Sequence, residues 1–132
     1  MAARPSDARY TKTHEWVKIA GTTAIVGITD FAVEHLGDLV FVELPAKGKK
    51  IGKPGEKLAE IESVKAVAEV YSPVAGEVLE ANAGLANDQG PLAKDPFGGG
   101  WLAKLKVPAG AKTADLMDAD AYQKHVDAEG AH

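Results

Sequence analysis

The chain has 132 residues, of which 45% are hydrophobic and 26% are charged, as expected for one globular domain. Its formal net charge is −4, and its basic residues are dispersed apart from four lysines between residues 47 and 53. We therefore expect no nucleic-acid partner, since phosphate binding needs a basic stripe. No apolar run reaches the roughly 20 residues of a membrane helix, so no membrane partner is expected either.

Two further features of the composition bear on location and chemistry. The first ten residues lack an apolar signal core, and Asp7 argues against a transit peptide. We expect a cytoplasmic, bacterial protein, with the mitochondrial matrix as the alternative for a eukaryotic source. The chain has no cysteine, so any sulfur chemistry must come from a cofactor.

Short apolar segments, rich in β-branched residues and separated by Gly and Pro, dominate the chain and predict β structure. No alternation of strands with helices is visible, so a doubly wound fold is not expected. Strands this short and numerous favour a compact barrel or sandwich with peripheral helices. The expected strands are residues 22–29, 39–44, 57–62, 66–71, 76–79 and 101–107.

Two helices are predicted between and after these strands. The first covers Asp30 to Leu36, because Thr29-Asp30 can cap its start and Gly37 suits the left-handed residue that ends a helix. Residues 84–100 hold seven Gly and Pro residues and predict a loop with at most one helical turn.

The second helix is expected over residues 113–128. Thr113 or Asp115 can cap it. Its expected apolar stripe consists of Leu116, Met117, Ala121 and Val126.

The segment around Lys65 carries the chemistry. Two strand-like runs meet at Ser63-Val64-Lys65, which predicts Lys65 at the tip of a hairpin. A solvated ammonium is a poor nucleophile and no general base, because catalytic lysines need burial or a cationic neighbour. An exposed lysine at a turn is accessible to a modifying enzyme, however, so Lys65 suits modification better than catalysis.

The residues around Lys65 also match a known family. Glu62-Ser63-Val64-Lys65-Ala66, followed by Ser72-Pro-Val-Ala-Gly-Glu-Val78, resembles the lipoyl site of the glycine cleavage system H-protein. The resemblance covers about residues 10 to 125 in the same order. Further matching blocks are Tyr10–Val17, Val26–Asp30, Leu36–Asp38, Val40–Pro45, Asp95–Phe97, Gly100-Trp101 and Asp120–Tyr122.

This resemblance implies a mainly β, flattened barrel-sandwich hybrid of the lipoyl/biotinyl type with two or three peripheral helices. It implies a single carrier domain over residues 1–132, with a lipoyl-type core at about 22–107. Lipoic acid would be amide-linked to Lys65, and Glu62, Ser63, Val64 and Ala66 would form the turn that the attaching enzyme recognises. A monomeric, non-catalytic carrier is expected.

The resemblance also implies partners. The carrier would shuttle the aminomethyl group of glycine from a pyridoxal-phosphate glycine decarboxylase to a tetrahydrofolate-dependent aminomethyltransferase. An FAD-containing dihydrolipoyl dehydrogenase would then reoxidise it. A lipoate ligase or octanoyltransferase would attach the cofactor.

H-proteins shelter the loaded arm in a cleft, and the matching positions here are Thr13, Glu15, His35 and Glu69. A carboxylate near the aminomethyl ammonium would form a charge-assisted hydrogen bond. From the residues alone, Glu15 could equally be a surface strand residue, and His35 could be a helix-end histidine favoured by the dipole.

Residues 85–100 depart from the family pattern, with Gln89-Gly-Pro-Leu-Ala-Lys94 in place of the usual block and Phe97 where tyrosine is common. A lipoyl-relay protein that passes lipoyl groups to other proteins is therefore an alternative. A biotin carrier domain is a weaker one, because methionines do not flank Lys65. No enzyme motif is present, and the four histidines show no metal-ligand spacing, so no metal site is expected.

Overall fold

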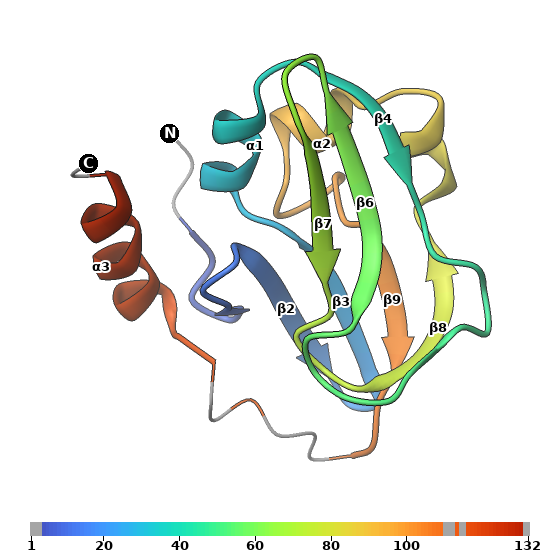
Figure 1. Cartoon of the computed structure of the whole chain (residues 1–132). Helices are drawn as coiled ribbons and strands as arrows, with labels where there is room; N and C mark the ends of the chain where they lie inside the picture. Colours follow the sequence, from blue (N-terminus) through green and yellow to red (C-terminus); the bar gives the residue numbers. More distant parts are fainter. Residues whose placement is uncertain (1–3, 110–112, 114–115, 131–132) are drawn as a thin grey trace.

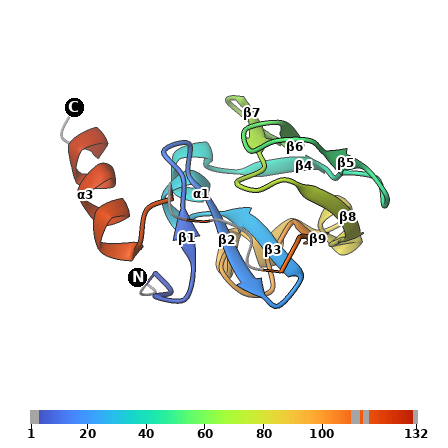
Figure 2. The same cartoon turned by 90° about the horizontal axis from the view of Figure 1, so that it is seen from below.

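The structure is a computed structural model that describes residues 4–109, 113 and 116–130. Two antiparallel sheets face each other, one with strand order β1-β2-β3-β9-β8-β5 and the other with order β4-β6-β7 (Figures 1 and 2). The strands are β1 (Arg9–Tyr10), β2 (Glu15–Ala20), β3 (Thr23–Ile28), β4 (Leu39–Glu43), β5 (Lys50–Ile51), β6 (Lys57–Ser63), β7 (Val67–Tyr71), β8 (Gly76–Ala81) and β9 (Ala103–Lys106). The helices are α1 (Asp30–Leu36), the 3-10 helix η1 (Ala83–Ala86), α2 (Gly90–Lys94) and α3 (Ala119–Gly130).

The predicted fold class is confirmed. The six expected strands correspond to β3, β4, β6, β7, β8 and β9, and the two sheets of the described residues form a sandwich that does not close into a barrel. Strand β2 was not predicted, because the charged residues Glu15 and Lys18 interrupt its apolar pattern. None of the helices in the described residues is long and apolar enough to cross a membrane.

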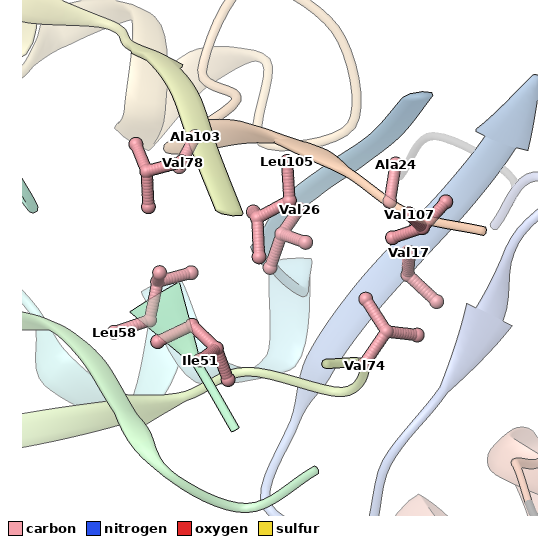
Figure 3. Packing of buried hydrophobic residues seen from close by; sticks show 10 residues of the cluster. All are labelled: Val17, Ala24, Val26, Ile51, Leu58, Val74, Val78, Ala103, Leu105 and Val107. Carbon is pink, nitrogen blue, oxygen red and sulfur yellow. The ribbon is translucent and has the colours of Figure 1, made fainter. Parts of the chain in front are cut away.

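The main core lies between the sheets and follows from alternation along the strands. Ala24 and Val26 of β3 and Leu105 of β9 are fully buried, because successive side chains of a strand point to opposite faces. They belong to the same cluster as Leu58 of β6, whose side chains Figure 3 shows. The cluster consists of Val17, Ala24, Val26, Ile51, Leu58, Val74, Val78, Ala103, Leu105 and Val107.

Helix α1 forms where the sequence predicts it. The Thr29 hydroxyl accepts a hydrogen bond from the Ala32 N–H at 3.3 Å, which caps the first turn. Gly37 has φ of 78°, and its N–H donates to the Val33 carbonyl at 3.2 Å. Val33 and Leu36 are the buried residues of the helix. Both ends of α1 are therefore set by local chemistry that the sequence displays.

The predicted start of the C-terminal helix is wrong. Helix α3 begins at Ala119, and Asp118 caps it by accepting a hydrogen bond from the Ala121 N–H at 2.8 Å. Thr113 is not helical, and the alternative cap at position 115 lies outside the described residues. Met117, expected on the helix, is extended instead, because its backbone pairs with Tyr10 through hydrogen bonds of 2.8 and 2.9 Å.

The buried face of α3 also differs from the predicted stripe. It consists of Tyr122 and Val126, while Ala121 is exposed. Tyr122 stacks on Tyr10 with ring centroids 4.9 Å apart, so aromatic stacking holds α3 to the N-terminal strand.

The segment 84–100 contains more structure than the predicted single turn. It includes most of η1 and all of α2, and Leu92 of α2 is fully buried. The carbonyl of Asp95 accepts hydrogen bonds from the N–H groups of Gly98 and Gly100. Gly100 lies so close to α2 that an added Cβ would be 2.7 Å from the Leu92 Cα. The glycines that suggested a loop therefore allow close packing here.

Trp16 and Gly27 are paired across β2 and β3 and form a second tight contact. The Trp16 indole N–H donates to the carbonyls of Ile28 at 2.9 Å and Pro96 at 3.0 Å. A Cβ at Gly27 would lie 2.6 Å from the Trp16 ring, closer than real contacts allow. The missing side chain at Gly27 thus makes room for a buried tryptophan.

Gly27→Ala is expected to lower the free energy of unfolding by about 1–3 kcal/mol, because the ring must shift in a packed core. Urea denaturation measures this. The matched control is Gly84→Ala, whose Cβ would meet nothing within 4 Å. Equal stabilities of the two variants would contradict this account of Gly27.

Candidate functional site

Lys65 lies at the exposed tip of the β6–β7 hairpin. Ser63 closes the turn, because its hydroxyl accepts hydrogen bonds from the N–H groups of Ala66 at 3.1 Å and Lys65 at 3.4 Å. The backbone N–H of Ser63 donates to the Ala66 carbonyl at 2.8 Å. A fixed two-residue loop, Val64-Lys65, is thus presented to solvent. The predicted exposure of Lys65 is confirmed.

The chain between α1 and β4 supports this tip. The Val64 N–H donates to the Asp38 carbonyl at 3.0 Å, and Gly37 lies beneath the Lys65 side chain. Figure 1 shows the tip of the green hairpin beside this connection. Apolar side chains stay exposed around Lys65: Val64 is 70% exposed and Val67 is 56% exposed. The lysine therefore emerges from a rigid turn with an apolar rim.

A cleft of about 310 Å³ runs between the same hairpin, α1 and the β1–β2 turn. The four residues predicted for it, Thr13, Glu15, His35 and Glu69, all line it. They come from three separate segments of the chain, because Thr13 and Glu15 are only two residues apart. Its walls are mostly apolar, formed by Ile28, Phe31, Ala32, Leu36, Ile61, Ala68 and Val70.

Glu15 is the buried member of this group, with only 1% of its surface exposed. Its Oε1 accepts hydrogen bonds from the Thr11 hydroxyl at 2.6 Å and from the Thr13 hydroxyl. Its Oε2 accepts one from the Tyr71 N–H at 3.2 Å. Glu15 belongs to β2 and Tyr71 ends β7, so this carboxylate joins the two sheets. The alternative of a surface strand residue is wrong.

Burial raises the pKa of the Glu15 carboxyl above its ordinary value, and the hydrogen bonds from Thr11, Thr13 and the Tyr71 backbone oppose this. Desolvation is the larger effect. Among the described residues, no lysine or arginine forms an ion pair with Glu15. A cation entering the cleft would therefore find a buried acceptor without a charged partner.

The other three predicted residues lie at the exposed edge of the cleft. Glu69 accepts a hydrogen bond from the Tyr71 hydroxyl at 2.9 Å. His35 stacks on Phe31 with ring centroids 5.9 Å apart. One buried carboxyl and several exposed polar groups thus surround an apolar interior.

The structure adds His14 and Glu129 to the cleft, and neither was predicted for it. His14 Nε2 lies 2.8 Å from the Glu129 carboxylate, and His14 Nδ1 lies 2.7 Å from the Tyr122 hydroxyl. Burial lowers the pKa of His14, and Glu129 opposes the shift. His14 belongs to the Tyr10–Val17 block that matches the family, so the sequence could have indicated it as a cleft residue. No sequence pattern could have indicated Glu129, because its position depends on how α3 packs.

Comparison with known proteins decides the family. The family model described as "Glycine cleavage H-protein" matches residues 8–129. The chain belongs to the glycine cleavage H-protein family. This family is the lipoyl carrier of the glycine cleavage system, so the predicted carrier function is confirmed.

Individual family members cover nearly the whole chain. The glycine cleavage system H protein of Rubrobacter xylanophilus is 46% identical over 129 residues, which is 98% of this chain and 99% of that protein. The Caulobacter vibrioides H protein is 52% identical over 115 residues, 87% of this chain and 94% of that one. A crystal structure of the H protein from Mycobacterium marinum matches with a TM-score of 0.81 at 38% identity, covering 96% of this chain and 99% of that one.

Glu15→Gln is expected to remove one source of pH-dependent stability. Because the pKa of Glu15 is raised in the folded state above the ordinary value of 4.5, the folded chain keeps a proton that the unfolded chain releases. Wild-type stability therefore falls as the pH rises from the ordinary pKa through the raised one, and glutamine lacks this loss. Urea unfolding between pH 4 and 8 measures the free energy of unfolding of both proteins. The value for the variant should rise relative to that of the wild type as the pH rises.

Glu34→Gln is the matched control, since Glu34 is an exposed carboxyl on α1. It should follow the wild-type pH dependence. A constant difference between Glu15→Gln and wild type across the pH range would contradict the raised pKa.

Proposed function

We propose that Lys65 carries the lipoyl group of this chain and that the cleft shelters the aminomethyl group bound to it. The observation that carries the proposal is that one hairpin bears both the attachment residue and part of the cleft wall. Lys65 is exposed at its tip, and Ile61 and Glu69 line the cleft farther down its strands. At about 3.3 Å per strand residue, Glu69 lies about 13 Å along the strand from Lys65. That span suits an extended lysine side chain bearing a lipoyl group.

The residues present fit the cofactor. Lys65 offers an accessible amine, and the apolar walls suit an alkyl chain and a sulfur ring, which gain free energy on leaving water. When bound, the lipoyl group supplies the sulfur that holds the aminomethyl group of glycine, which this chain cannot supply because it has no cysteine.

Glu15 holds the cationic end of the cargo. A carboxylate out of water binds an ammonium through a charge-assisted hydrogen bond that is roughly twice as strong as a neutral one. Thr11, Thr13 and the Tyr71 N–H keep the Glu15 carboxylate oriented before the cargo arrives. Glu69, Thr13 and His35 close the polar edge of the cleft, where they limit the entry of water.

The tip serves the enzymes that act on this carrier. Val64 and Ala66 flank Lys65 in a turn fixed by Ser63, and Glu62 adds an exposed carboxylate. A lipoate ligase or octanoyltransferase would read this shape. The proposed partners of the loaded carrier are the pyridoxal-phosphate glycine decarboxylase, the tetrahydrofolate-dependent aminomethyltransferase and the FAD-containing dihydrolipoyl dehydrogenase. The chain itself is non-catalytic and acts as one carrier domain over residues 1–132, in the cytoplasm of a bacterium.

Lys65→Arg is expected to abolish attachment of the lipoyl group, because the guanidinium keeps the charge but cannot form the amide. Intact-mass spectrometry after co-expression with a lipoate ligase measures this. The matched control is Lys53→Arg at another exposed turn, which should gain one lipoyl group as the wild type does. A lipoyl mass on Lys65→Arg would place the cofactor elsewhere.

Glu15→Gln, fully lipoylated and loaded, is expected to lose its aminomethyl group about tenfold faster or more, because a hydrogen bond to a charged group is worth about 1.5–3 kcal/mol. The release of the cargo over time from purified loaded protein measures this. Glu34→Gln, whose carboxyl lies outside the cleft, should release it at the wild-type rate. If Glu15→Gln is lipoylated normally and releases its cargo no faster, the sheltering role is refuted while the attachment site stands.

A further inference from the structure

Three side chains that the proposed function does not use converge beside the cleft. They are His14 of the β1–β2 turn and His125 and Glu129 of α3. Their ligand atoms all lie within 4.8 Å of one another. The Glu129 carboxylate lies between the imidazoles, 2.8 Å from His14 Nε2 and 3.2 Å from His125 Nε2. Residues more than a hundred positions apart thus meet with nitrogen and oxygen atoms facing one another.

His14 is held in place before any ligand arrives. Its φ of 73° is left-handed and unusual for a residue with a side chain. Its backbone is fixed by hydrogen bonds, from its N–H to the Thr11 carbonyl and from the Thr29 N–H to its carbonyl. Its ring lies 4.6 Å from that of Phe31 between centroids. The backbone and the aromatic contact together aim the imidazole at α3.

A second layer of contacts sets which nitrogen of His14 is available. His14 Nδ1 lies 2.7 Å from the Tyr122 hydroxyl, which in turn lies 2.6 Å from the Thr29 hydroxyl. Without a metal, the 2.8 Å contact has His14 Nε2–H donating to the Glu129 carboxylate. In the tautomer whose Nδ1–H donates to the Tyr122 hydroxyl, Nε2 carries no hydrogen and its lone pair is free to bind a metal. A hydrogen bond from the outer ring nitrogen is how metal-binding histidines are usually oriented.

The two residues from α3 form a pair that chelates from one helix face. His125 and Glu129 are four residues apart, and this spacing places their side chains together. His125 Nε2 also lies 3.0 Å from the Lys12 carbonyl, on the same β1–β2 turn as His14. Side-chain exposures of 15% for His14 and 23% for His125 leave the site accessible to a small ion.

We propose that His14, His125 and Glu129 form a binding site for Zn²⁺. Two imidazole nitrogens and one carboxylate oxygen are a ligand set that zinc accepts, and at bond lengths of about 2.0–2.2 Å tetrahedral ligands lie about 3.4 Å apart. The separations of 2.8 and 3.2 Å from Glu129 need only small adjustments to reach this. On binding, the ion takes the place of the Nε2 hydrogens that face Glu129, and these protons are released to solvent. The contact of His125 Nε2 with the Lys12 carbonyl is lost, and the ion fastens α3 to the β1–β2 turn instead.

Three protein ligands leave one coordination position open, as in zinc sites that exchange ligands. His14 and Glu129 both line the cleft, so a bound ion would lie at its edge. The proposal does not depend on Lys65, because none of the three ligands requires a lipoyl group. It therefore stands or falls separately from the proposed function.

The test uses the full-length, unlipoylated protein after treatment with a chelator. Zn²⁺ is titrated in competition with a chromophoric chelator at pH 7.5, and one zinc per chain is expected. Glu129→Gln and His125→Gln should each weaken zinc binding at least ~10-fold, since even indirect partners of a metal cost about 10–100-fold. Far-UV circular dichroism checks that each variant keeps its fold.

The matched control is Asp127→Asn, an exposed carboxylate on α3 that accepts a hydrogen bond from Gln123 and is not among the converging ligands. It should bind zinc as the wild type does. A second measurement uses Co²⁺ in place of Zn²⁺. Its visible absorption should indicate four- or five-coordination in the wild type, and this absorption should be lost in Glu129→Gln. Zinc binding that is equal in wild type, Glu129→Gln and His125→Gln, or that is absent from the wild type, would overturn the proposal.

Discussion

Glu15 forms the polar link between the two sheets beside the cleft. Its carboxylate is out of water and accepts hydrogen bonds from the Thr11 and Thr13 hydroxyls of the β1–β2 turn and from the Tyr71 N–H of β7 in the other sheet. Burying a carboxylate without a charged partner costs free energy, which is why burial raises the pKa of Glu15. An arriving ammonium would pair with the Glu15 carboxylate. The pairing would offset part of the free-energy cost of burying that carboxylate and so favour binding of the cargo.

In the proposed function, one hairpin both presents the attachment site and protects the bound group. At the tip, Ser63 and the Asp38 carbonyl hold the turn, so Lys65 would meet an attaching enzyme in a constant orientation. Farther down, the same two strands supply part of the apolar wall of the cleft. A tethered group that moves between these places stays at about millimolar effective concentration, so weak contacts suffice at each. The carrier then needs rigidity in its scaffold and freedom only in the arm.

The sequence predicted those parts of the fold that depend on residues close together in the chain. Short apolar segments between Gly and Pro residues located six strands, and Thr29 and Gly37 located α1, because strands and caps depend on neighbours in sequence. The four cleft residues came from the family resemblance, because burial of Glu15 depends on Tyr71, fifty-six positions away. The start of α3 was wrong because Met117 pairs with Tyr10, and the convergence of Glu129 on His14 depends on that same packing. Long-range contacts of this kind leave no trace in a single-sequence pattern.

The central claim is that an arm attached at Lys65 rests beside Glu15 when it is loaded. Nuclear Overhauser spectroscopy on lipoylated protein carrying a ¹³C-labelled aminomethyl group tests it most directly. The account predicts cross-peaks from the labelled methylene to methyl groups of Ile28, Ile61 or Val70, which line the cleft. A methylene with a sharp, solvent-like resonance and no cross-peak to these residues would contradict it.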